Sequence, residues 1–176
     1  MKKISDYLLQ LRNKYGHKPS NVRRITVNYS QAKQIGILFH IQSEQAHDML
    51  NQFVAKLKKD GKQITALAFF EREASNPYSF SFDFFRQKDI SATGTIRSET
   101  VNQFIQTPFD YLYCIQSMPF PPFDYILTQS HAKCRIARIF EEQDVISDLS
   151  IALPEQADES ELIRKMQHYT EQITEN

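Results

Sequence analysis

The sequence predicts an α/β fold, namely a single-domain Rossmann-like three-layer sandwich with a mostly parallel sheet of five or six strands. Residues 35–41 and 64–70 are nearly uninterrupted apolar runs, which are typical of strands buried on both faces of a parallel sheet. Between them, apolar residues from Ala46 to Leu57 recur at the spacing of one helix face. Ser43 is the expected N-cap of this helix and Gly61 its C-terminal cap. The three segments therefore form a β-α-β unit, whose crossover is expected to be right-handed.

Residues 78–84 alternate between aromatic and polar side chains, which predicts a half-exposed strand at an edge of the sheet. The linker before this strand is too short for a crossover helix, so an antiparallel return is favoured, with a parallel strand after a wider loop as the alternative.

Strands and helices continue to alternate up to the C-terminus. Ser98 is the expected cap of a short helix that ends at Pro108, and a helix is expected to begin at Pro121 and Pro122. Strands are expected at residues 111–115 and 134–139 and near 148–153. The last helix begins with the cap pair Asp158 and Glu161, and its expected buried stripe is Leu162, Met166, Tyr169 and Ile173.

Charge divides the chain although the net charge of its 176 residues is zero. Residues 1–24 carry seven basic side chains against Asp6 and form a predicted basic amphipathic N-terminal arm or helix, distinct from the α/β domain of residues 25–176. Residues 141–176 carry ten acidic side chains against Arg164 and Lys165. The neutrality is a cancellation between two oppositely charged ends.

Several classes of protein are excluded by composition. The four glycines are too widely spaced for a phosphate-binding loop or a dinucleotide fingerprint, so we expect no nucleotide cofactor. The chain has only two cysteines and no His-Glu-x-x-His pair, so we expect no metal site. The N-terminus has no apolar stretch resembling a signal peptide and no run approaches the roughly 20 apolar residues of a membrane span, so a cytoplasmic location with reduced cysteines is expected.

Four stretches carry a resemblance to a known family. They are residues 32–39, residues 83–85 with Lys88 and Asp89, Phe109 with Asp110, and residues 125–133. Over roughly residues 31–173 the chain resembles an uncharacterised family of small bacterial domains of unknown function. It departs from the pattern at residues 90–94 and at Cys114, where the family often has an acid.

A shorter stretch, residues 132–136, is similar to part of the N-terminal half of heptosyltransferase-like glycosyltransferases. The similarity implies glycosyltransferase-like ancestry. Those enzymes need a second half-domain to hold a sugar nucleotide, and this chain has no residues left to build one.

The candidate site follows from the rule that ligands of open parallel sheets bind beyond the carboxyl ends of the strands. The loops there offer Gln42, Arg72, Gln116 and Met118 and, as the candidate side chains, His40 and Ser43, Glu71 and Glu73, and Ser117. A histidine, two carboxylates and a hydroxyl have the chemistry for acid–base work. The alternatives are a hydrogen-bonded strand-end histidine, a solvated charge run and a structural helix cap.

Three functions remain open at this point. The first is a non-catalytic cytoplasmic domain that acts through protein interaction, as a homodimer joined by its charged ends. The second is a small-molecule enzyme or ligand-binding domain that uses the crevice at the strand ends. The third is binding of RNA or a membrane surface through Lys2, Lys3, Arg12 and Lys14 of the basic arm.

Overall fold

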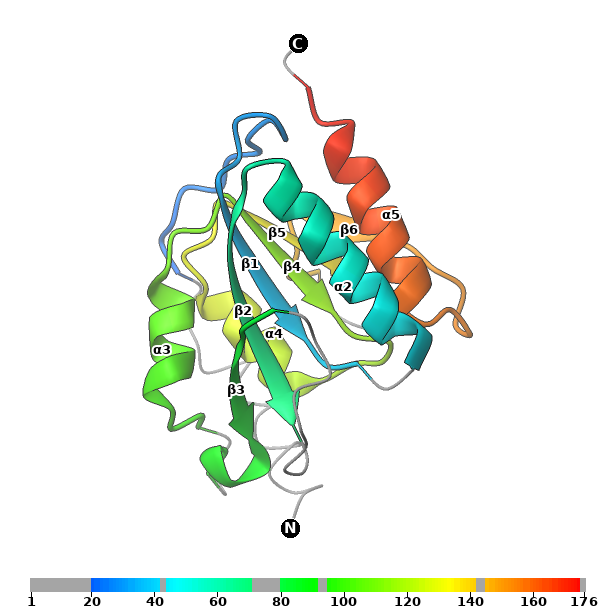
Figure 1. The fold of residues 1–176 in the computed structure, drawn as a ribbon. Helices are drawn as coiled ribbons and strands as arrows, with labels where there is room; N and C mark the ends of the chain where they lie inside the picture. Colours follow the sequence, from blue (N-terminus) through cyan, green and yellow to red (C-terminus); the bar gives the residue numbers. More distant parts are fainter. Residues whose placement is uncertain (1–19, 42–43, 71–79, 92–94, 142–144, 175–176) are drawn as a thin grey trace.

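The computed structural model describes residues 20–41, 44–70, 80–91, 95–141 and 145–174, and the predicted arm up to residue 19 lies outside this part. The described residues form a parallel sheet between two layers of helices (Figure 1). In chain order the elements are β1 (Gln34–Phe39), α2 (Glu44–Lys59), β2 (Gln63–Phe70), β3 (Asp83–Arg86), the 3-10 turn η1 (Gln87–Asp89), α3 (Glu99–Gln106), β4 (Tyr111–Ile115), α4 (Pro121–Gln129), β5 (Cys134–Arg138), β6 (Leu149–Ile151) and α5 (Glu159–Glu171).

The sheet has six strands in the order β3-β2-β1-β4-β5-β6, and every neighbouring pair is parallel. This confirms the predicted α/β class. The chain builds outward from β1 to β3 and then returns to build from β4 to β6 on the other side of β1. The strand order therefore reverses between β1 and β4, and the carboxyl ends of all six strands share one edge.

Successive side chains along each buried strand point to opposite faces of the sheet, so the core consists of two apolar clusters, one on each face. In β4, the Tyr113 hydroxyl donates a hydrogen bond of 2.9 Å to Thr170 of α5, whereas Cys114 belongs to the apolar cluster under α3 and α4. Helices α2 and α5 cover one face, and α3 and α4 cover the other (Figure 1). Both layers are needed because strands this apolar expose hydrophobic side chains on both faces.

The predicted helix signals in the described part are confirmed. Ser98 Oγ accepts a hydrogen bond from the Val101 N–H, and Asp158 Oδ1 accepts one of 3.1 Å from the Glu161 N–H. Gly61 has a φ of 74°, the left-handed conformation that ends α2. The expected cap Ser43 lies outside the described residues.

The favoured antiparallel return of the edge strand is wrong. The strand starts at Asp83 and pairs in parallel with β2, with Leu67 opposite Asp83. The aromatic alternation before it has another cause, because Phe80 and Phe82 pack edge-on against Phe39 with ring centroids 6.2 and 5.6 Å away. With β3 starting at Asp83, residues 71–82 separate it from β2, and at about 3.3 Å per extended residue this length does not require a crossover helix.

The predicted inner stripe of α5 is wrong at one position. Tyr169 is 44% exposed, and the fully buried Ile163 faces the sheet beside Leu162 and Met166. Tyr169 has the spacing of the buried stripe. The orientation of α5 about its own axis, set by its packing against α2 and β4, turns Tyr169 toward solvent.

The described end of the basic segment is bound to the domain. Ser20 Oγ donates a hydrogen bond of 2.8 Å to the Ser130 carbonyl, and Arg24 donates to the Ala132 carbonyl. The Ile25 N–H donates a further hydrogen bond of 3.0 Å to the Lys133 carbonyl. No helix among the described residues has the length and apolar character to cross a bilayer.

Candidate ligand site at the carboxyl edge of the sheet

Two cavities lie at the carboxyl ends of β4, β5 and β6. They adjoin, because both are lined by Arg138, Ile139 and Phe140 from the end of β5. The smaller cavity lies on the α4 face, and we call it the notch. The larger cavity lies toward the N-terminus of α5, and we call it the acidic cavity.

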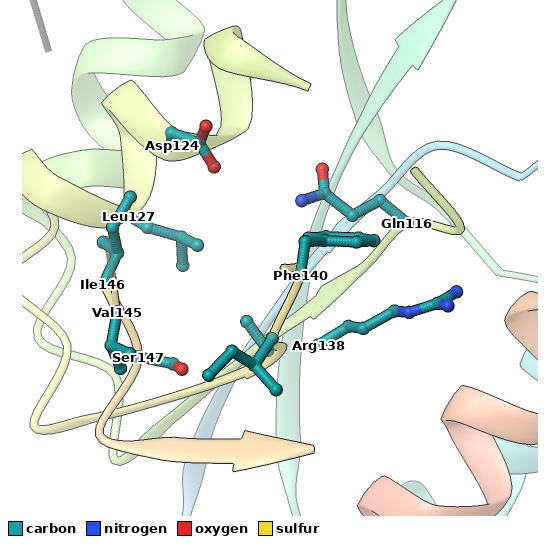
Figure 2. A pocket seen from close by; sticks show the side chains of 10 residues that line it. Gln116, Asp124, Leu127, Arg138, Phe140, Val145, Ile146 and Ser147 are labelled. Atoms are coloured by element: carbon teal, nitrogen blue, oxygen red, sulfur yellow. The ribbon is translucent and has the colours of Figure 1, made fainter. Parts of the chain in front are cut away.

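The notch has a volume of about 20 Å³, which is room for a group the size of one water molecule. Gln116, the residue after β4, and Asp124 of α4 face each other across it (Figure 2). The rest of its wall is largely apolar and includes Leu127, Val145 and Ile146. The polar groups of the notch are therefore held in surroundings that offer them few partners.

Gln116 is only 3% exposed, and its carboxamide oxygen Oε1 is buried without a hydrogen-bond partner among the described residues. The oxygen of a carboxamide can accept two hydrogen bonds, so this arrangement leaves its accepting capacity unused. Leaving a buried polar group unsatisfied costs about 1–3 kcal/mol. A residue retained at that cost in a cavity is a candidate for binding a ligand.

Asp124 stands in the first turn of α4, after the two prolines that open the helix. Burial of its carboxyl group raises its pKa from 3.8 to about 7, because a low-dielectric environment disfavours the charged form. Its acid and carboxylate forms therefore coexist near neutral pH. A carboxyl group in this condition can donate or accept a hydrogen bond, or exchange a proton with a bound molecule.

The acidic cavity has a volume of about 720 Å³, within the range of small-molecule sites. Four carboxylates line it, from Glu141, Glu155, Asp158 and Glu159. Glu159 is 2% exposed, and its Oε1 has no hydrogen-bond partner among the described residues. The cavity thus presents a negative lining with a buried carboxylate in it.

Arg138 is the one cation among the described lining residues. Backbone carbonyls occupy the two terminal nitrogens of its guanidinium, whereas its buried Nε has no hydrogen-bond partner among the described residues. Its guanidinium donates hydrogen bonds to the carbonyls of Ser117, Pro154, Ala157 and Glu155, at 2.9, 2.7, 3.0 and 3.3 Å. It also lies over the Phe140 ring, 5.0 Å from the centroid. Arg138 therefore joins the loop before α5 to the end of β4 and shapes the cavity.

The structure places the sequence-predicted site residues in different surroundings. Ser117 lines the acidic cavity. The His40 ring packs against Phe69 and Phe120, with centroids 5.3 and 5.4 Å away, and lines neither cavity. Ser43, Glu71 and Glu73 lie outside the described residues, so a shared site for all five stays a prediction.

Gln116 belongs to a loop that the sequence places at the site, whereas Asp124, Arg138 and Glu159 are side chains that the sequence did not predict there. Gln116 had a signal, since a polar residue directly follows a strand that is buried throughout. Asp124 had none, because an acid in the first turn of a helix is the ordinary complement of the helix dipole. Among the described residues, no group of three His, Cys, Asp or Glu side chains is arranged to hold a metal ion.

Comparison with known proteins gives one match. No curated protein and no solved structure matches the chain, so the similarity of residues 132–136 to heptosyltransferase-like enzymes gains no support. A model of a family of unknown function, DUF6913, matches residues 6–173, which is nearly the whole chain. The chain belongs to this family of unknown function, DUF6913.

Proposed function

We propose that this domain binds a small organic molecule at the carboxyl edge of β4, β5 and β6. One observation carries the proposal: the Gln116 carboxamide, whose oxygen has no hydrogen-bond partner among the described residues, faces the same cavity as the buried Asp124 carboxyl, whose pKa burial raises to about 7. A polar group of the ligand would supply the donor that the Gln116 oxygen lacks and would exchange a hydrogen bond with Asp124.

The arrangement of the two cavities supports a bipartite ligand. The notch has room for one small polar group, and the adjoining acidic cavity has room for the body of a molecule. The exposed Ile139 and the half-buried Phe140 stand between them and offer apolar contact.

This proposal differs from the crevice expected at His40, because the His40 ring packs against Phe69 and Phe120 and lines neither cavity. It agrees with the general rule that places ligands beyond the carboxyl ends of parallel strands. The proposed site lies toward β5 and β6, whereas the sequence placed the candidate site nearer to the end of β1.

The test is Gln116→Met, which keeps the length of the side chain and removes the carboxamide. We expect the variant to melt higher than the wild type, since it no longer buries unsatisfied polar atoms. A fragment set of amides, alcohols, amines and carboxylic acids, screened by ligand-observed NMR, should give compounds that bind the wild type and not the variant.

Gln87→Met is the matched control, because Gln87 also has a buried side-chain oxygen without a partner but lies in η1, away from both cavities. It should leave fragment binding unchanged. Equal fragment binding by the wild type and Gln116→Met would refute the proposal.

A further inference from the structure

We infer that the ligand of this edge is an organic cation, a molecule with at least one primary amine or guanidinium group that binds in the acidic cavity. The inference rests on the proposed function and names the class of its ligand.

The charge of the lining is the first reason. Four carboxylates line the acidic cavity, and the two terminal nitrogens of the Arg138 guanidinium donate to four backbone carbonyls. An anionic ligand would meet repulsion from these carboxylates, and Arg138 would offer it only the buried Nε–H. A cationic ligand would be attracted, and a concave site focuses that attraction.

Glu159 is the second and independent reason. It lines the cavity and is only 2% exposed. One of its carboxylate oxygens, Oε1, has no hydrogen-bond partner among the described residues. An ionised carboxylate in such a position is costly unless a positive group pairs with it. An ammonium or guanidinium group of the ligand would supply both the opposite charge and the hydrogen-bond donors.

The helix N-termini at this edge argue against a phosphate-bearing ligand. Phosphates in α/β folds bind free N–H groups at the start of a helix. Helix α4 starts with Pro121 and Pro122, which have no N–H group. At the start of α5, the Asp158 carboxylate already accepts a hydrogen bond from the Glu161 N–H. The donors that would hold a phosphate are thus absent or occupied by an acid.

The experiment compares three probes of similar length by calorimetry on the full chain: cadaverine, pentanediol and glutarate. Cadaverine should bind, and its affinity should fall with added salt because the attraction is ionic. Glutarate and pentanediol should bind at least about tenfold more weakly, the ratio expected for loss of a charged hydrogen bond.

The decisive variant is Glu159→Gln, with Glu161→Gln as its matched control. Both remove one negative charge from the first turn of α5, but Glu161 does not line the cavity. Glu159→Gln should weaken cadaverine binding about tenfold or more, whereas Glu161→Gln should change it less than about twofold. Should Glu159→Gln fail to fold, Glu155→Gln and Glu141→Gln remove exposed carboxylates of the same cavity and are expected to weaken binding as well.

The possible failures separate the two proposals. Binding of glutarate or pentanediol that depends on Gln116 would overturn the cationic ligand and leave the site standing. Cadaverine binding that depends on Glu159 but survives Gln116→Met would uphold the cation and refute the role of the notch. No binding by any of the three probes, or equal effects of Glu159→Gln and Glu161→Gln, would overturn the inference.

Discussion

Gly36 in β1 lies directly against the ring of Phe109: a Cβ atom at position 36 would stand 2.7 Å from Phe109 Cδ2. Real Cβ atoms essentially never come so close to another heavy atom. Phe109 is fully buried and cannot swing away into solvent. The glycine is therefore required by packing between β1 and the segment that enters β4.

Gly36→Ala should destabilise the protein by about 1–3 kcal/mol, the usual cost of overpacking a core. Urea denaturation measures this loss. Combined with Phe109→Leu, which makes room for the added methyl group, the alanine should cost less than it does alone. A cost that is the same in both backgrounds would refute the contact as its cause.

Asp110 joins the amino ends of β1, β4 and β5. Its carboxylate accepts hydrogen bonds from the Lys33 and Gln34 N–H groups at 2.7 and 3.0 Å and from Lys133 Nζ at 2.7 Å. Burial acts to raise the pKa of Asp110, but these three donors outweigh it and hold the pKa below the ordinary 3.8.

Asp110→Asn should cost about 1.5–3 kcal/mol at neutral pH, as expected for hydrogen bonds to a charged group. Because the folded-state pKa lies below the unfolded one, this stabilisation is complete above pH 3.8 and is lost as the pH falls through the folded-state value. The wild type and the variant should therefore converge in strong acid. Denaturation curves of both proteins at neutral and acidic pH test this, and a constant gap would contradict it.

The carboxyl group of Asp124 should make the stability of the protein depend on pH in the opposite direction. Its folded-state pKa of about 7 exceeds the unfolded value of 3.8, so between these pH values the unfolded chain releases a proton that the folded protein retains. Stability is consequently lost as the pH rises through this window. Asp124→Asn should match the wild type below pH 3.8 and exceed it above pH 7, by on the order of 1–3 kcal/mol because solvent screens a partly exposed group. Carbon-13 NMR of the Asp124 carboxyl measures the pKa directly, and an ordinary value would refute the expectation.

The two cysteines should be unreactive in the folded protein. Both are free and buried, and burial raises the pKa of Cys134 to about 11 and that of Cys114 well above its ordinary value. They lie on the neighbouring strands β4 and β5 but pack in different layers, with Cys134 under α5 and Cys114 under α4. A thiol reagent should label both only at the rate of unfolding. Fast labelling under native conditions would contradict this.

Self-association through the oppositely charged ends stays a prediction. If the basic residues 1–24 of one copy pair with the acidic residues 141–176 of another, dimers should be favoured at low salt and dissociate as salt is added. Sedimentation velocity over a salt series measures this. A monomer at every concentration and ionic strength would refute the homodimer.

The sequence by itself determined the order and faces of most elements. Unbroken apolar runs gave β1 and β2, the helical spacing gave α2, and local caps such as Ser98, Asp158 and Gly61 marked where helices begin or end. These signals are readable because each depends on residues within a few positions of one another, where the geometry of the backbone fixes which side chains are neighbours.

Only the tertiary structure decided the direction of β3, the exposure of Tyr169 and the meeting of Gln116 with Asp124. The aromatic alternation around Phe80 and Phe82 is compatible with a strand and equally with rings packed on Phe39. Contacts with residues distant in sequence determine which of the two forms. A site at the carboxyl edge likewise depends on how β4, β5, α4 and α5 stack. The Gln116 carboxamide oxygen is left unpaired only after that stacking has excluded every partner for it within the described residues.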